Sequence, residues 1–510
     1  MILIKDREPE MNLSNEITSE FDKSLIEIHI KSVLTRLSEF LVSRSVHSYL
    51  VGGFIRDVLL GRDTADIDIT VDADVLSIGP QIADQFQGKF ILLDEVNGIG
   101  RIILKDLTLD IASFTGEIGS DLARRDFTID AMAIDMNQLG LYNPDITLID
   151  PFGGRTDLDR GIVRSVTNTA FSSDPVRLLR AVRLSFELGF NIDKKTELEI
   201  SSSTNRITKV PGERVREELL RLLVSSRSGH VFNYMDKLGL LTALIPEISL
   251  LRGVTQPREH YWDVLEHSIN TVSAVDFILH QGVWDHKNKD ILAKVPWTSS
   301  LAQYFDQSVS NGSTRRSLLK LAALLHDISK PQAKAFDENG RMRFLGHSEE
   351  GSMVVSSILE RLRFSSKEVK QVSFMVKYHL RPTQMSQDKL PTRRAIYRYF
   401  RDIGDVGIDT LYLSLADHLA TRGPDLLMAN WEYHTRLVDY VLTEHVQQEK
   451  LVQPVKLIDG NDLINVFGMK PGPEIGRILE QILEAQAAGE LTTREEALDY
   501  TRNYLLTEGK

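Results

Sequence analysis

The spacing of apolar residues changes once along this 510-residue chain, and that change limits the folds open to it. Between residues 30 and 150, short runs rich in β-branched residues alternate with helical patterns, which predicts an α/β domain. After residue 161 the strand signals fade, and amphipathic helical patterns continue toward the C-terminus. We therefore predict an α+β protein in which an N-terminal α/β head is followed by all-helical domains.

The same pattern predicts where the domains lie. A chain of this length, with 42% hydrophobic residues, can bury several cores. The predicted parts are a flexible leader at 1–22, the head at 23–165, a helical neck at 166–250, a further helical domain at 251–425 and a helical tail at 426–510.

Composition excludes several classes of protein. The chain has no cysteine, which excludes a disulfide framework and cysteine-ligated zinc and fits a reducing compartment. No apolar run approaches the ~18 residues of a membrane span, so we expect a cytoplasmic protein with no membrane partner. The net charge is -12, yet residues 155–230 carry 14 Lys and Arg against 10 Asp and Glu. That segment either meets phosphates or is an ordinary solvated helical surface.

Two aspartates interrupt an apolar strand pattern in "ADIDIT" (65–70). Because strand side chains alternate, Asp66 and Asp68 share one face and Ile67 and Ile69 the other. Two carboxylates so close repel each other unless a cation lies between them, which predicts a divalent metal. The alternative is a solvated strand edge.

Gly52 and Gly53 stand where the preceding apolar run ends and a helical pattern begins. A glycine backbone at a helix start lets a phosphate approach the amide groups. Phosphate beside the helix and metal on the strand together describe one nucleoside triphosphate. Asp110, in "LTLDIASF", is the candidate for a third carboxylate of a two-metal site, or else an ordinary strand-end aspartate.

The stretch "LVGGFIRDVLLGRDTADIDI" resembles the first motif of class II tRNA nucleotidyltransferases, the family of CCA-adding enzymes, their CC- and A-adding relatives and bacterial poly(A) polymerases. Further motifs follow in the family's order: "LARRDFTIDAMA" (122–133), "IDPFGGRTDL" (149–158), "SDPVRLLRAVR" (173–183) and "GERVREELLRLL" (212–223). The end of the chain, 457–500, is similar to CCA-type tails. The resemblance implies a polymerase-β-like nucleotidyltransferase head, an RNA- and nucleobase-binding neck and a tRNA-binding tail.

The resemblance also implies roles for single residues. Asp66 and Asp68 would hold Mg²⁺ and be catalytic, together with Asp110 if it is the third carboxylate. The nucleotide-binding set is Gly52, Gly53 and Arg56 at the triphosphate, Asp57 orienting an arginine, Arg124, Arg125 and Asp126 at sugar and phosphate, and Asp174, Arg177, Arg180 and Arg183 on the base-reading helix. The motif "RRDFTIDAMA" could instead be a basic helix start before a buried strand.

The chain departs from the family at two positions. Ser173 stands where the family usually has Glu, which puts the support of the base-reading helix in doubt. Asp130 stands where the family often has Asn, a change we expect to lie outside the chemistry.

The chemistry of the base-reading helix can be argued from its residues. Asp174 can cap a helix, and Arg177, Arg180 and Arg183 then recur on one slowly drifting face, which would otherwise be a solvated face. A carboxylate accepts from an exocyclic amine while an arginine donates to the neighbouring ring nitrogen. Cytosine and adenine share that pattern, whereas uracil and guanine reverse it. A protein site can therefore select C and A without a nucleic-acid template.

A series of histidines and aspartates follows between residues 260 and 420. It comprises His267, His326, Asp327, His347, His379 and Asp417. The series resembles the HD metal-dependent phosphohydrolase superfamily, which makes 251–425 an HD domain. Imidazole and carboxylate ligands suit Mn²⁺, Fe²⁺, Co²⁺, Ni²⁺ or Zn²⁺, and a bound hydroxide could attack phosphate. The alternative is a helical body that keeps the ligands without turnover.

The leading functional hypothesis is template-independent addition of CMP, AMP or both from CTP and ATP to the 3′ end of tRNA. Poly(A) polymerase activity on general RNA ends is an alternative within the same fold. From other classes, the chain could act mainly as an HD phosphohydrolase on nucleotides or RNA cyclic ends, or as an RNA-binding scaffold. The sequence does not decide between CCA, CC-only and A-only addition, nor does it give the oligomeric state.

Overall fold

The computed structural model describes residues 18–21, 26–139, 146–286, 289–385, 390–451 and 456–508. The chain divides into two compact units, Met1–Val210 and Pro211–Lys510. Their boundary falls inside the predicted neck.

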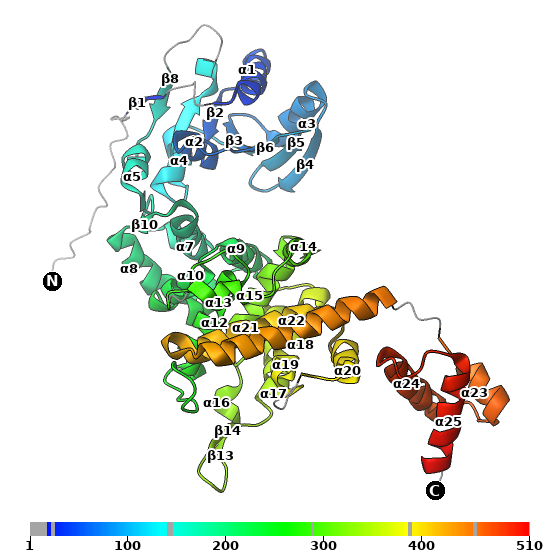
Figure 1. The fold of residues 1–510 in the computed structure, drawn as a ribbon. Coiled ribbons are helices and arrows are strands. Elements are labelled where there is room, and N and C mark those ends of the chain that lie inside the picture. The colour runs from blue at the N-terminus through cyan, green and yellow to red at the C-terminus, as the bar shows by residue number, and fades with distance from the viewer. Residues whose placement is uncertain are drawn as a thin grey trace, which may run out of the picture. The chain divides into compact units, whose positions relative to one another are not determined.

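An eight-stranded sheet forms the first unit, with the strand order β1-β8-β7-β2-β3-β6-β5-β4 (Figure 1). The strands are β1 Thr18–Phe21, β2 Ser48–Val51, β3 Asp66–Val71, β4 Lys89–Asp94, β5 Ile99–Ile103, β6 Thr108–Ser113, β7 Ala133–Asp135 and β8 Ile146–Ile149. Strands β3 and β6 are parallel, and the other neighbours are antiparallel. The predicted mixed head with alternating strands and helices is confirmed.

Strand β1 corrects the predicted leader. Residues 18–21 were placed in a flexible segment, but they pair with β8 from Thr18↔Ile149 to Phe21↔Ile146 at the edge of the sheet. Phe21 is buried in the head core. Four residues are too few to show a periodic pattern, so the sequence alone gave no strand signal here. Residues 1–17 and 22 of the predicted leader lie outside the described residues.

The core of the head covers one face of β3. Ile67 and Ile69 are fully buried in a cluster that includes Leu34 and Leu37 of α1. Asp66 is exposed and Asp68 is half-buried on the opposite face, as the alternation predicts. The helices of this unit are α1 Ile28–Val42, α2 Gly53–Leu59, α3 Val75–Gln85, α4 Ile118–Ala123, α5 Gly154–Arg160, α6 Ala170–Ser173, α7 Arg177–Leu188 and α8 Lys194–Ser203.

Helices dominate the second unit. They are α9 Gly212–Val224, α10 Ser228–Lys237, α11 Leu240–Leu244, α12 Val264–Ile278, α13 Lys289–Ala293, α14 Ser299–Asp306, α15 Arg315–Leu325, α16 Lys330–Ala333, α17 His347–Arg361, α18 Ser366–Tyr378, α19 Arg381–Gln384, α20 Arg393–Ile403, α21 Gly407–Arg422, α22 Met428–Leu451, α23 Gly460–Phe467, α24 Pro473–Ala487 and α25 Arg494–Glu508.

Three two-stranded ribbons correct the prediction that everything after the head is helical. They are β9 Ile162–Val163 with β10 Asn191–Ile192, β11 Ser308–Ser310 with β12 Ser313–Thr314, and β13 Lys334–Phe336 with β14 Met342–Phe344. Strands of two or three residues carry no readable alternation.

Helix α15 lies at the centre of the second unit and is buried on all sides. Three of its cations are therefore buried too, and each has a carboxylate partner on another element. Lys320 Nζ lies 2.7 Å from Asp276 Oδ1 of α12 and donates to the carbonyl oxygens of Leu223 and Ser225. Because an unpaired buried charge is costly, this pairing fixes α15 against the C-terminal end of α9.

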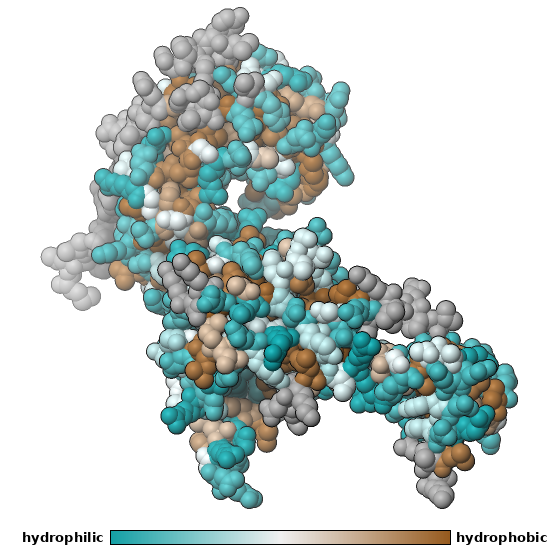
Figure 2. Space-filling view, in the orientation of Figure 1, coloured by the Kyte–Doolittle hydropathy of each residue, from teal (hydrophilic) through white to brown (hydrophobic). Residues whose placement is uncertain are grey.

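Among the described residues, no helix is both long enough and apolar enough to cross a bilayer. On the face drawn in Figure 2, hydrophilic and hydrophobic residues are interspersed over both units.

Candidate nucleotide and metal sites

The predicted carboxylates of the head lie on neighbouring strands. Asp68 of β3 is paired in register with Asp110 of β6, and Asp66 with Thr108. Directly paired residues on parallel strands point to the same face of a sheet. Asp68 and Asp110 are therefore side by side, as the sequence alone could not show.

This arrangement disfavours the ionised form of the Asp68 carboxyl. Burial raises the pKa of its carboxyl to about 6, while the charge of Arg125 lowers it and Asp110 raises it further. A carboxylate that is held in a partly buried place beside a second carboxylate is poorly stabilised by the protein alone. The donor set, oxygen ligands on one face of a sheet, fits a hard divalent cation such as Mg²⁺.

The glycine turn before α2 is required by close contacts. Gly52 has φ +73°, and a Cβ placed there would lie 2.7 Å from Arg125 Nη1 and 2.8 Å from Asp68 Oδ2. The backbone N–H of Gly53 donates to Asp68 Oδ2 at 3.1 Å. The sequence predicts that this amide meets phosphate; in the structure it donates to Asp68, a predicted metal ligand.

Arg56 of α2 is held between two carboxylates. Its Nε and Nη2 donate to Asp57, and its Nη1 donates to Asp130 Oδ1 at 2.6 Å. Asp130 lies in the short 3-10 helix Thr128–Asp130 and is buried. Asp130 was expected to lie outside the chemistry, but it contacts an arginine of the predicted triphosphate site.

The arginine motifs converge on Asp126. This buried carboxylate accepts from Arg180 Nη1 at 2.8 Å. Burial alone would raise the pKa of Asp126, but Arg180 and Arg177 hold it below its usual range. Arg177 Nη2 also donates to the carbonyl oxygen of Arg124 at 2.7 Å. The motifs at 122–133 and 173–183, far apart in sequence, thus form one side-chain cluster in the first unit.

The predicted base-reading helix starts later than the sequence indicated. Helix α7 begins at Arg177, its N-cap is Val176, and no side chain caps it, so the expected cap by Asp174 is wrong. Asp174 has extended backbone at the end of α6. Its carboxylate is therefore not committed to a helix cap. Arg183 pairs with Glu187 on its own helix at 2.7 Å.

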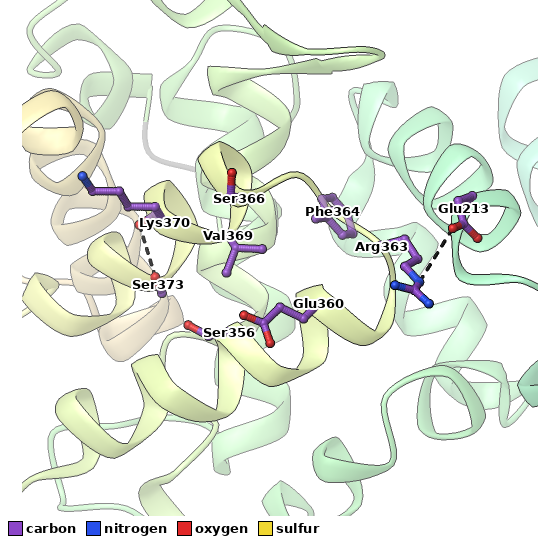
Figure 3. A pocket seen from close by; sticks show the side chains of 9 residues that line it. All are labelled: Glu213, Ser356, Glu360, Arg363, Phe364, Ser366, Val369, Lys370 and Ser373. Carbon is purple, nitrogen blue, oxygen red and sulfur yellow. Dashed lines mark hydrogen bonds and ion pairs between the residues drawn. The ribbon is translucent and has the colours of Figure 1, made fainter.

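The motif at 212–223 joins helices within the second unit. Arg216 of α9 donates to the fully buried Glu368 of α18 at 2.7 Å. A Cβ on Gly212 would lie 2.7 Å from the carbonyl oxygen of Arg361, so only glycine fits there. A cavity of about 680 Å³ lies at the same junction (Figure 3), where Arg363 faces Glu213 at 3.7 Å. None of the predicted site residues lines it.

The six predicted HD residues come together in the second unit. They are His267 on α12, His326 and Asp327 after α15, His347 at the start of α17, His379 after α18, and Asp417 on α21. Two sets have ligand atoms close enough to hold a metal ion: His267 with His326 and Asp327, and Asp327 with His347 and His379. Asp327 belongs to both sets, so it can bridge two ions.

Hydrogen bonds fix the orientation of three of these imidazoles. Nδ1 of His326, His347 and His379 lies 2.9, 2.6 and 2.7 Å from a backbone carbonyl oxygen. A carbonyl only accepts, so each Nδ1 carries a proton and each Nε2 faces the cluster. Yet Nε2 of His347 and Nε2 of His379 are 3.3 Å apart. A proton on one of these nitrogens, or a cation bound by both, relieves the repulsion between their lone pairs.

Access to the HD cluster differs between its members. The side chain of Asp417 is 25% exposed, whereas those of His267, Asp327 and His379 are essentially buried. Burial and the neighbouring His326 lower the pKa of His379 to about 3, so its ring is neutral and able to bind a metal. Solvent therefore reaches the cluster on the side of Asp417.

Three residues of these sites were missed by sequence reasoning. Arg101 of β5 donates from Nε and Nη2 to both oxygens of Asp110, at 2.7 Å each. Lys330 Nζ lies 2.6 Å from Asp327 Oδ2. Asp130 is the third. The pairing register of β5 and the turn after Asp327 place the two cations, and neither can be derived from a single sequence.

A mixed sheet with adjacent strand carboxylates, a glycine turn against them and converging arginines defines a nucleotidyltransferase. Models of known families match the chain in the same order: "Poly A polymerase head domain" at 48–119 and 109–164, "Probable RNA and SrmB- binding site of polymerase A" at 189–251, "HD domain" at 297–422, and "tRNA nucleotidyltransferase domain 2 putative" at 430–500. His267 lies before the matched HD segment.

Similar proteins cover nearly the whole chain. The CC-adding tRNA nucleotidyltransferase of Thermus thermophilus is 32% identical over 458 residues, which are 88% of this chain and 92% of that protein. The A-adding tRNA nucleotidyltransferase of Deinococcus radiodurans is 30% identical over 461 residues, 89% of this chain and 95% of that protein. The chain therefore belongs to the tRNA nucleotidyltransferase family, whose chemistry uses a divalent metal, generally Mg²⁺.

Solved structures share the fold. A CCA-adding enzyme in complex with ATP aligns with a TM-score of 0.64 and 23% identity, covering 97% of this chain and 99% of that one. The Thermotoga maritima CCA-adding enzyme complexed with tRNA aligns with a TM-score of 0.60 and 23% identity, covering 96% and 100%. The predicted order of a sheet-containing head followed by helical domains is confirmed.

Proposed function

We propose that the chain adds CMP, AMP or both, from CTP and ATP, to the 3′ end of tRNA. The observation that carries the proposal is the pair of adjacent strand carboxylates, with Gly53 N–H on Asp68 and the glycine turn against Arg125. In the reaction the terminal 3′-hydroxyl oxygen of the RNA forms a bond to the α-phosphorus. The bond from that phosphorus to the β-phosphate bridging oxygen breaks, and pyrophosphate leaves.

Separate groups of head residues would bind the two ends of one nucleotide. Asp66 and Asp68, with Asp110, would hold Mg²⁺, which when bound activates the hydroxyl and neutralises the leaving pyrophosphate. Arg56 and Arg125 offer positive charge to the triphosphate next to the carboxylates.

At the other end of the nucleotide, Asp174 and Arg177 would pair with the base, and Asp126 holds Arg180 beside them.

The cytoplasmic location expected from the sequence stays a prediction.

Incorporation of labelled nucleotides tests the proposal. Purified protein is given labelled CTP, labelled ATP, or both, with tRNA ending at the discriminator base, at C or at CC. We expect one or more residues to be added to the ends that match its specificity and then addition to stop, because a protein site reads each base. The lanes also separate CCA, CC-only and A-only addition. Lack of incorporation on all three ends would contradict the proposal, and long A tracts made from ATP on unstructured RNA would identify a poly(A) polymerase.

We also propose that the HD cluster binds two metal ions and hydrolyses phosphate esters of nucleotides or RNA ends. The facing Nε2 atoms of His347 and His379, with Asp327 shared by both sets, favour this second function. Mn²⁺, Fe²⁺, Co²⁺, Ni²⁺ or Zn²⁺ suits these ligands. When bound, such an ion supplies a hydroxide at neutral pH.

Replacing Asp327 by Ala should remove this second function alone. We expect the bound transition metal, measured by mass spectrometry of the purified protein, to fall by about two ions per chain, and ring opening of a nucleoside 2′,3′-cyclic phosphate probe to the monophosphate to be lost. CTP and ATP incorporation should stay within about twofold of wild type. Asp425→Ala, an exposed aspartate, is the control. Metal content unchanged in Asp327→Ala would contradict the assignment, as would ring opening of the probe lost in Asp66→Ala instead.

A further inference from the structure

Three charged side chains form a row across the middle of the head sheet. Asp68 on β3 is paired with Asp110 on β6, and Asp110 is paired in turn with Arg101 on β5. Directly paired residues share a face of the sheet, so a cation stands at the end of the carboxylate row. Its place is set by the pairing of the strands and not by a flexible loop.

The contact between Arg101 and Asp110 is bidentate, so each carboxylate oxygen accepts one N–H at 2.7 Å. The two side chains are 42% and 29% exposed. Ion pairs this accessible to water contribute little to folding stability, so stability alone gives no reason for the pair. The guanidinium also lies within electrostatic reach of Asp66 and Asp68, which together with Asp110 raise the pKa of Arg101.

The bidentate pair matters for metal binding. A divalent ion bound by Asp66 and Asp68 needs further oxygen ligands, and Asp110 is the neighbouring carboxylate in the row. Both of its oxygens are engaged by Arg101. A metal and the guanidinium carry charge of the same sign, so they repel each other if both stand beside the row.

We propose that Arg101 is a built-in counter-cation that competes with the divalent metal for Asp110. Without metal, Arg101 neutralises the carboxylate row. When metal binds Asp66 and Asp68, Arg101 releases Asp110, which then completes the ligand set. The inference rests on the proposed nucleotidyl transfer, because it concerns the metal of that reaction. Arg101 is in this view a positioning residue that lowers the affinity of the free enzyme for metal.

Binding of Mn²⁺ alone, without nucleotide, measures this competition. The full-length chain carries Asp327→Asn so that the HD cluster does not contribute, and titration is followed by calorimetry and by the Mn²⁺ electron paramagnetic resonance signal. We expect Arg101→Met to tighten Mn²⁺ binding about tenfold, the size of one exposed charge-assisted contact. Arg101→Lys, which keeps the charge but not the two-pronged contact, should tighten it less.

Two further variants separate competition from a general change of charge. In an Asp110→Asn background, Arg101→Met should change Mn²⁺ affinity by less than about twofold, because the shared carboxylate is gone. Lys89→Met removes a cation from the neighbouring strand β4 and should have no effect. Thermal unfolding of every variant checks that it is folded.

The results that would contradict the inference can be told apart from one another and from failure of the proposed function. Unchanged or weaker Mn²⁺ binding in Arg101→Met, with loss of CTP affinity, would overturn the inference and make Arg101 a phosphate-binding residue. Equal tightening with and without Asp110 would also overturn it, because the effect would then be long-range charge alone. Failure of the proposed function would show separately, as absence of CTP and ATP incorporation by the wild-type protein.

Discussion

Asp68→Asn is expected to abolish nucleotide incorporation and at the same time to stabilise the metal-free protein. The amide cannot replace a charged metal ligand, so the rate should fall by about a thousandfold or more. The gain in stability has a separate cause. Burial raises the pKa of Asp68 to about 6, so the folded state disfavours the ionised carboxyl, and the neutral amide removes that cost.

The sign of this effect depends on pH. Because the pKa of Asp68 is higher in the folded state than in the unfolded state, its neutral form supports folding below about pH 4. That support is lost as the pH rises through 6. The free energy of unfolding of Asp68→Asn should therefore exceed that of wild type above pH 6, by at most roughly 3 kcal/mol, and the difference should vanish near pH 4.

Thermal and denaturant unfolding in a chelator at pH 4, 6 and 8 measure the difference. Asp63→Asn, an exposed aspartate just before β3, is the matched control and should change neither activity nor stability. If Asp68→Asn is less stable than wild type at pH 8, the carboxylate instead stabilises the fold through its hydrogen bond with the N–H of Gly53. Incorporation above about a tenth of the wild-type rate would remove Asp68 from the metal site.

The strand alternation in 65–70 was sufficient to place Asp66 and Asp68 on the face opposite Ile67 and Ile69. This part of the site follows from local geometry, because strand side chains alternate whatever the rest of the fold does. The pairing of Asp68 with Asp110 depends on the register of two strands about 40 residues apart. A single sequence holds no record of that register, so the position of Arg101 beside Asp110 emerged only in three dimensions.

For the histidine cluster too, part of the site follows from the sequence and part only from the three-dimensional structure. The residue types and their order were enough to predict six HD ligands. What the sequence could not supply is the orientation of three of the four rings, which is set by carbonyl groups three residues earlier in the chain. It could not supply the role of Asp327 in both ligand sets either. The expected helix cap at Asp174 failed because α7 begins only at Arg177, with Val176 as its N-cap.

Asp174→Asn is expected to relax the choice of base. A carboxylate only accepts, so it pairs with the exocyclic amine of cytosine or adenine and rejects the carbonyl of uracil or guanine. An amide can turn its NH₂ toward those carbonyls. We expect kcat/KM for CTP and ATP to fall about a hundredfold, since a site that hydrogen-bonds its substrate discriminates strongly. The ratio of UTP to CTP incorporation should rise by about as much.

The surroundings of Arg177 explain why the effect should be on base choice and not on folding. Arg177 keeps its contacts to the carbonyl oxygen of Arg124 at 2.7 Å and to Ser173 Oγ at 3.4 Å. Asp174 does not cap α7, so the helix keeps its start in the variant. Steady-state kinetics with each of the four nucleoside triphosphates measure the change, and Asp159→Asn, at an exposed side chain of α5, is the control. If UTP and CTP are used in an unchanged ratio while both rates fall, Asp174 supports the cluster around Asp126, and the base is read by other residues.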